Sequence, residues 1–139
     1  MELREQNVLI TGAGGGIGRP AAVEIARQGG FVILAERAAS RPAGEATLQA
    51  VEAAGGAGLY VDLDVTDDES CRETLAQVRA DRGPIHSFLN VAGVVLGGSV
   101  DETPMEKIQE QLDVHYLGPV RVFQQLSPPW REAGFGIFL

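Results

Sequence analysis

Thr11-Gly12-Ala13-Gly14-Gly15-Gly16-Ile17-Gly18 is a glycine-rich run between two stretches of different hydrophobic pattern. Residues 7–11 before it are mostly apolar and β-branched, which predicts a strand buried on both faces of a parallel sheet. After it, Ile17, Ala21 and Ile25 recur every four residues, which predicts a helix. A strand, a glycine loop and a helix in this order place backbone N–H groups at a helix N-terminus, where the helix dipole favours a pyrophosphate.

Strands and helices continue to alternate along the rest of the chain. Hydrophobic spacing predicts strands at 31–35, 58–62, 86–91 and, as a start only, 136–139, with helices over 44–54, 66–82 and 103–126. Thr66 and Glu69 form a capping box at the start of the second of these helices, and Pro128-Pro129 is predicted to end the third. The alternation predicts an α/β fold whose parallel sheet is covered by helices on both faces, as a single domain over residues 1–139.

The composition limits the classes of partner. With 45% apolar and 22% charged residues, the chain is typical of an ordinary globular protein. Eleven Lys and Arg against nineteen Asp and Glu give a net charge of −8, which repels nucleic acids and anionic membranes. No apolar run approaches the ~18 residues of a membrane span, and the charged residues 1–6 do not resemble a secretory signal. We therefore expect a cytoplasmic protein that binds neither nucleic acid nor membrane.

Disulfides and metal sites are not expected. Cys71 is the only cysteine, which excludes an intramolecular disulfide and is too few for a cysteine zinc site. Asp62 and Asp64 are interpreted as acids at a strand end. Asp67 and Asp68 are interpreted as acids of a first helical turn, where the helix dipole favours negative charge. These four aspartates therefore do not predict a cation site.

Glu36 is the candidate for cofactor choice, because it stands 18 residues beyond Gly18 at the end of the second predicted strand. A carboxylate there can accept both hydroxyls of an adenosine ribose and repel a 2′-phosphate, which predicts NAD rather than NADP. The alternative is an exposed loop acid. Neighbouring Arg37 acts against the NAD interpretation, since guanidinium groups hold 2′-phosphates well.

Four ordered motifs resemble the short-chain dehydrogenase/reductase family, and together they span the chain. They are the spacing Thr-Gly-x-x-x-Gly-Ile-Gly of residues 11–18, Asp64-Val65, Asn90-Val91-Ala92-Gly93 and Val114-His115-Tyr116-Leu117-Gly118. The resemblance implies a Rossmann-type doubly wound sheet with strand order 3-2-1-4 and a fifth-strand stub at 135–139, incomplete relative to the family. It also implies a dinucleotide site with Gly12, Gly16, Ile17 and Gly18 at the pyrophosphate, Glu36 at the ribose, Asp64 and Val65 at adenine, and Asn90, Ala92 and Gly93 in the middle.

The resemblance also implies which catalytic groups to look for. The family uses a Ser on the fifth strand and a Tyr-x-x-x-Lys on the following helix, and we expect both to be missing from these 139 residues. Lys107, the only lysine, precedes Tyr116 by nine residues, which in a regular helix is roughly 900° and puts the two on opposite sides. His115 stands at the family's relay Asn. It is a candidate general acid–base, but a substitute hydrogen-bonding group is the favoured interpretation.

Three functions remain open on the sequence. The chain is the NAD(H)-binding part of an alcohol or ketone oxidoreductase, inactive alone; or a natural short form that acts as a dinucleotide sensor or partner subunit; or an isomerase or cyclase that uses His115. The part of the family's fold that is expected to be missing would normally cover the fourth strand, which predicts an exposed apolar surface there. We expect self-association through the free edge of the fourth strand and the apolar helix face around Leu112, Val120 and Phe123.

Overall fold

A computed structural model describes residues 3–139, and its centre is a five-stranded sheet in the order β3-β2-β1-β4-β5. All neighbouring strands are parallel. The strands are β1 (Asn7–Thr11), β2 (Phe31–Glu36), β3 (Ala57–Asp62), β4 (Ser87–Asn90) and β5 (Ile137–Phe138). The α/β class, the strand order 3-2-1-4 and the fifth-strand stub are therefore confirmed.

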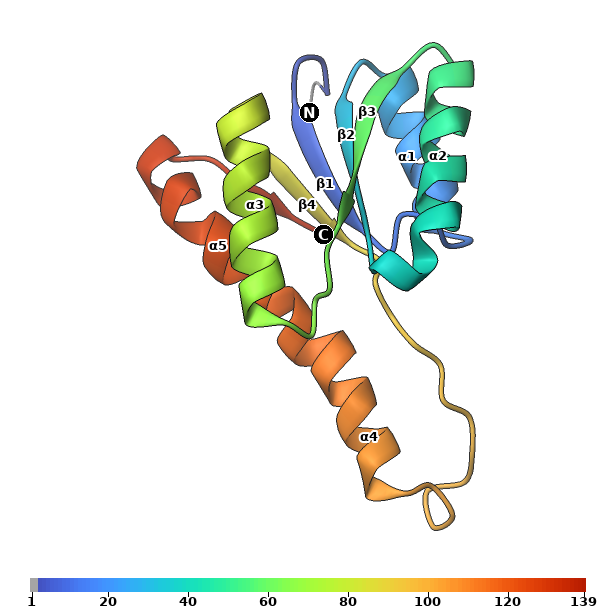
Figure 1. Ribbon diagram of the computed structural model, residues 1–139. Helices are drawn as coiled ribbons and strands as arrows, with labels where there is room; N and C mark the ends of the chain where they lie inside the picture. Colours follow the sequence, from blue (N-terminus) through green and yellow to red (C-terminus); the bar gives the residue numbers. More distant parts are fainter. Residues whose placement is uncertain (1–2) are drawn as a thin grey trace.

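Helices cover both faces of the sheet. Figure 1 shows α1 and α2 on one side and α3 and α5 on the other, while α4 projects away from the sheet. The helices are α1 (Gly18–Arg27), α2 (Arg41–Ala53), α3 (Asp68–Arg82), α4 (Met105–Leu112) and α5 (Gly118–Ala133), with a 3₁₀ turn η1 (Ala38–Ser40) and a π-helical segment η2 (Asp113–Leu117).

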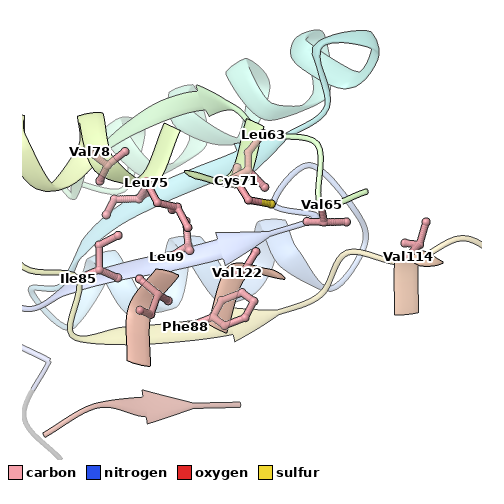
Figure 2. Packing of buried hydrophobic residues seen from close by; sticks show 13 residues of the cluster. Leu9, Leu63, Val65, Cys71, Leu75, Val78, Ile85, Phe88, Val114 and Val122 are labelled. Atoms are coloured by element: carbon pink, nitrogen blue, oxygen red, sulfur yellow. The ribbon is translucent and has the colours of Figure 1, made fainter. Parts of the chain in front are cut away.

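Each face of β1 contributes to a separate core. Val8 and Ile10 belong to the cluster beneath α1 and α2, whereas Leu9 belongs to the cluster beneath α3 and α5 (Figure 2). All five residues of β1 are buried, so the strand has no solvent face that would need polar side chains. This is why the strand is continuously apolar at its centre instead of alternating.

The predicted capping box at the start of α3 is wrong. Asp67, not Thr66, caps the helix, because Asp67 Oδ1 accepts from the backbone N–H groups of Glu69 and Ser70. The Thr66 hydroxyl instead donates to Asp64 Oδ1 at 2.7 Å, and the Thr66 N–H donates to the same oxygen at 2.9 Å. Asp64 therefore holds Thr66 in a turn before the helix begins.

The prediction that Pro128-Pro129 ends the last helix is also wrong, since α5 continues through both prolines to Ala133. A proline inside a helix frees the carbonyl four residues earlier, which for Pro129 is that of Gln125. Arg79 Nη1 donates to this carbonyl at 3.1 Å and so satisfies it from α3. The last turn gains a further tertiary bond, from Trp130 Nε1 to the Ile85 carbonyl at 2.6 Å.

The prediction that β4 has a free edge is wrong, because β5 pairs with that edge. The Ile137 N–H donates to the His86 carbonyl and the Asn90 N–H donates to the Leu139 carbonyl, so residues 137–139 cover it. The three apolar residues expected to form a helix face are all exposed, Leu112 on α4 and the other two on α5. Leu112, Val120 and Phe123 are 57%, 41% and 39% exposed.

Candidate functional site

A cavity of about 470 Å³ opens at the carboxyl ends of the strands, where the chain order reverses between β1 and β4. Open parallel sheets bind ligands at this topological switch point. Eight of the ten residues predicted to bind a cofactor line the cavity. They are Gly12, Gly16, Ile17, Glu36, Asp64, Val65, Ala92 and Gly93.

The glycine loop brings backbone close to the opposite wall of the cavity. Gly12 has a φ of +70°, and a Cβ on it would lie 2.7 Å from the Ala92 nitrogen, so only glycine fits between the ends of β1 and β4. Gly16 lines the cavity, and a Cβ on it would meet no atom within 4 Å, so the space beside this glycine is open. Helix α1 has no side-chain cap and no acid in its own first turn, so none of its own residues opposes its positive dipole end.

Two of the ten predicted residues do not line the cavity and instead support its walls. A Cβ on Gly18 would lie 2.3 Å from the Gly12 carbonyl oxygen, so Gly18 allows the loop to fold onto the start of α1. Asn90 Oδ1 accepts from the Thr11 hydroxyl at 3.0 Å, which joins the ends of β4 and β1. Thr11 itself lines the cavity; the sequence identified it as the first residue of the glycine motif, but it was not among the residues predicted to bind the cofactor.

Glu36 is fixed at the loop by a hydrogen bond that the sequence did not predict. Its Oε1 accepts from the Gly14 N–H at 2.7 Å, and the side chain is half-buried at the cavity wall. A carboxylate has a second acceptor oxygen, so Oε2 can accept from a ligand while Oε1 holds the loop. Arg37 lines the same cavity and is exposed, so a guanidinium that attracts a 2′-phosphate is also present beside the Glu36 carboxylate that repels it.

The cavity wall at Val65 is held from outside by Arg121, which the sequence analysis missed. The Val65 carbonyl accepts from Arg121 Nη1 at 3.2 Å. Burial lowers the pKa of Arg121, but the hydrogen bonds and charges of Asp113 and Asp68 outweigh this effect and raise the pKa above its ordinary value. The guanidinium is therefore a permanent cation behind the cavity.

His115 lies in η2, is exposed and does not line the cavity. Its Nε2 is 3.2 Å from the Val94 nitrogen and 2.7 Å from the Val94 carbonyl oxygen. One ring nitrogen can donate or accept, but it cannot do both at once. A Cβ on Gly93 would lie 2.6 Å from His115 Cε1, so the ring packs directly behind the Gly93–Val94 wall. The geometry favours His115 as a support of that wall.

Tyr60, Tyr116 and Cys71 lie away from the cavity. Burial and the hydrogen bond to Asp62 raise the pKa of Tyr60 above its ordinary value, and Tyr60 lies on β3 under the Arg41 guanidinium. Tyr116 is 67% exposed on η2. Burial raises the pKa of the Cys71 thiol to about 11, and the side chain is fully buried in the core, so it has no access to a ligand.

Residues 3–139 contain neither a metal cluster nor a membrane-spanning helix. Within this range no group of three or more His, Cys, Asp or Glu side chains is arranged to hold a metal ion. Over the same residues, no helix has both the length and the apolar character to cross a membrane.

Comparison with known proteins gives one consistent result. The family model of the short chain dehydrogenases matches residues 6–137. An uncharacterized oxidoreductase of Thermotoga maritima is 28% identical over all 139 residues, which make up 54% of that protein. An uncharacterized oxidoreductase of Mycobacterium tuberculosis is 32% identical over 93% of the chain and 39% of its own length. The chain thus spans about half the length, or less, of the curated relatives it matches.

Solved structures agree with the sequence relatives. A short-chain type dehydrogenase/reductase from Mycobacterium marinum superposes with a TM-score of 0.91 at 28% identity, covering 99% of this chain and 55% of its own. A xylitol dehydrogenase solved with bound NAD⁺ superposes with a TM-score of 0.92 at 26% identity, covering 99% of this chain and 53% of its own.

Proposed function

Since the chain belongs to the short-chain dehydrogenase family, we propose that it is the NAD(H)-binding part of an oxidoreductase that transfers hydride between the cofactor and an alcohol or ketone. The observation that carries this proposal is the cavity at the β1–β4 switch point, with the glycine loop on one wall and Glu36 and Asp64 on others. The cofactor, when bound, supplies the nicotinamide ring that accepts or donates the hydride.

The residues present fit a dinucleotide in one orientation. The open space at Gly16 and the uncapped start of α1 suit the pyrophosphate, because backbone N–H groups there can donate to its oxygens. Glu36 Oε2 would accept from the ribose hydroxyls, and Asp64 and Val65 would lie against adenine. Ala92 and Gly93 would form the wall beside the middle of the cofactor.

This arrangement also favours NAD over NADP. A 2′-phosphate at the ribose would lie beside the Glu36 carboxylate, and two negative charges at such a distance repel each other. Arg37 reduces this repulsion because it is exposed on the same cavity. We propose that the carboxylate dominates, since it is anchored to Gly14 whereas the exposed arginine must be ordered before it can bind.

Calorimetric titration with NAD tests the proposal, with Gly16→Val as the disabling variant. A Cβ at Gly16 meets no protein atom, so the variant should fold, but its side chain would occupy the space assigned to the pyrophosphate. Losing even one charge-assisted hydrogen bond costs roughly 1.5–3 kcal/mol, so the affinity should fall about tenfold or more. Gly97→Val is the matched control, because a Cβ there also meets nothing within 4 Å and Gly97 does not line the cavity. Absence of NAD binding by the unmutated chain, or equal binding by Gly16→Val, would contradict the proposal.

A further inference from the structure

The Arg121 side chain connects three separate segments of the chain. Its Nη1 donates to the Val65 carbonyl at 3.2 Å, its Nε donates to Asp68 Oδ1 at 2.8 Å, and its Nη2 pairs with Asp113 Oδ1 at 2.8 Å. The side chain is only 18% exposed. A guanidinium has five N–H donors in a rigid planar fork, so it can fix three acceptors relative to one another, which a lysine ammonium on its flexible stem does not do.

The three acceptors belong to the walls of the cavity or lie directly beside them. Val65 lines the cavity itself, and Asp68 begins α3 three residues later. Asp113 begins η2, and the next residue, Val114, also lines the cavity. Arg121 does not line the cavity, yet it holds two of its walls at a set separation.

Val65 receives a second support from the same helix. A Cβ on Gly118 would lie 2.9 Å from Val65 Cγ2, so Gly118 allows α5 to approach the Val65 side chain closely. Gly118 and Arg121 are three residues apart and share one face of α5. Helix α5 therefore fixes Val65 in two ways, by packing on its side chain and by a hydrogen bond to its carbonyl. Because Asp64 is the preceding residue, its backbone is fixed as well.

We propose that Arg121 is a positioning residue for recognition of the adenine ring: by holding Val65, it fixes the Asp64 carboxylate where the exocyclic amino group of the base binds. The inference rests on the proposed function. Asp64 Oδ1 already accepts from Thr66, which orients the carboxylate and leaves the other oxygen for the base. The amino group of adenine donates a hydrogen bond to such an oxygen, whereas the oxo group of hypoxanthine is an acceptor and repels it. A carboxylate held at the amino position therefore favours adenine, whereas a displaced one can accept from the N1–H of hypoxanthine and loses the preference.

The experiment compares the affinities of the full chain for NAD and for nicotinamide hypoxanthine dinucleotide by calorimetry. In the unmutated chain we expect NAD to bind about tenfold more tightly or better, the value of one hydrogen bond to a charged group. In Arg121→Met the preference should fall below about threefold. Arg121→Lys should give an intermediate ratio, because it restores the charge but not the fork.

Arg79→Met is the matched control. Arg79 also connects α3 to α5, through its hydrogen bond to the Gln125 carbonyl, but it does not line the cavity and does not contact Val65. A purely structural role of such an arginine would lower the melting temperature without changing the choice of base. We therefore expect Arg79→Met to lose stability and keep the preference for NAD.

The outcomes separate this inference from the proposed function. Failure of the unmutated chain to bind either dinucleotide contradicts the proposed function. A preference for NAD that is the same in Arg121→Met and in the unmutated chain overturns the role of Arg121 alone. Where Arg121→Met does not fold, Asp113→Ala carries the test, because it removes one acceptor of the guanidinium and keeps the arginine; an unchanged preference in that variant also overturns the inference.

Discussion

Replacing Glu36 by glutamine separates two roles of this side chain. In the structure, Oε1 accepts from the Gly14 N–H at 2.7 Å and so holds the glycine loop. In the proposed function, the carboxylate also accepts from the adenosine ribose and repels a 2′-phosphate. Glutamine keeps an oxygen that can accept from Gly14 but has no charge. We therefore expect Glu36→Gln to preserve the loop, with a loss in the free energy of unfolding no larger than the difference between a charged and a neutral hydrogen bond, and to reduce the preference for NAD.

The size of the effect follows from the contacts. A hydrogen bond to a charged group contributes about 1.5–3 kcal/mol, and a neutral one about 0.5–1.5 kcal/mol. Losing the charge should therefore weaken NAD binding by about 1 kcal/mol or more, which is roughly fivefold. Removing the repulsion acts in the opposite direction on NADP, since two unit charges 4 Å apart interact by up to about 4 kcal/mol near a protein surface before salt screening. Together these changes should lower the ratio of NAD to NADP affinity about tenfold or more.

Calorimetric titration of NAD and NADP into both proteins measures this ratio. Glu45→Gln is the matched control, because it removes the same charge from an exposed acid on α2 that is paired with Arg41 and does not line the cavity. The control should keep the ratio of the unmutated protein. Equal affinities for NAD and NADP in the unmutated protein, or an unchanged ratio in Glu36→Gln, would refute the assignment of Glu36 to the ribose.

ADP-ribose should bind within a few-fold of NAD, a difference under about 1 kcal/mol, because the directional contacts proposed for the cofactor all lie on its adenosine and pyrophosphate side. Competition calorimetry in which NAD binds a hundredfold more tightly would show that other groups hold the nicotinamide. The chain should also self-associate through the exposed apolar face formed by Leu112, Val120 and Phe123, giving dimers at high micromolar concentration in sedimentation. Leu112→Asp should shift the protein to monomers and Val100→Asp, at an 88% exposed residue outside that face, should not; sedimentation as a monomer only would contradict the prediction.

The strands could be predicted closely because their residues are mostly apolar, both in β1, which is buried on both faces, and in the edge strand β3, which is only partly buried. The expected strand at 7–11 is β1 itself, and the one at 58–62 differs from β3 by a single residue. Helix α1 was also found, but its apolar spacing does not identify the buried face. Ile17 is 71% exposed, whereas the buried positions of α1 are Gly18, Ala22 and Ala26. Small residues face the sheet because they allow the helix to approach it closely, and hydrophobic spacing does not register this.

The supports of the cavity could not be predicted in the same way. Arg121 contacts Val65 and Asp68, which lie 56 and 53 residues earlier in the chain. Neither end of such a contact has a local pattern, because an arginine on a helix usually faces solvent. The C-terminal end of α5 was predicted wrongly for the same reason, because a contact with a residue distant in the sequence decides it. Proline is unfavourable within a helix because it leaves a carbonyl without its N–H partner. Here Arg79 on α3 donates to the freed Gln125 carbonyl, and the sequence around the prolines does not reveal this.

The π-helical segment shows how a departure from regular geometry relates to the site. Lys107 and Tyr116 would lie on opposite sides in a regular helix, but the chain is π-helical over Asp113–Leu117, so the angle does not hold across this segment. Three consecutive residues here serve the cavity: Asp113 pairs with Arg121, Val114 lines the wall, and His115 contacts Val94. A regular turn spaces neighbours by about 100° and would direct these side chains differently. The part of the predicted helix that departs from α geometry is therefore the part that builds the site, in keeping with the occurrence of π-helical turns at functional sites.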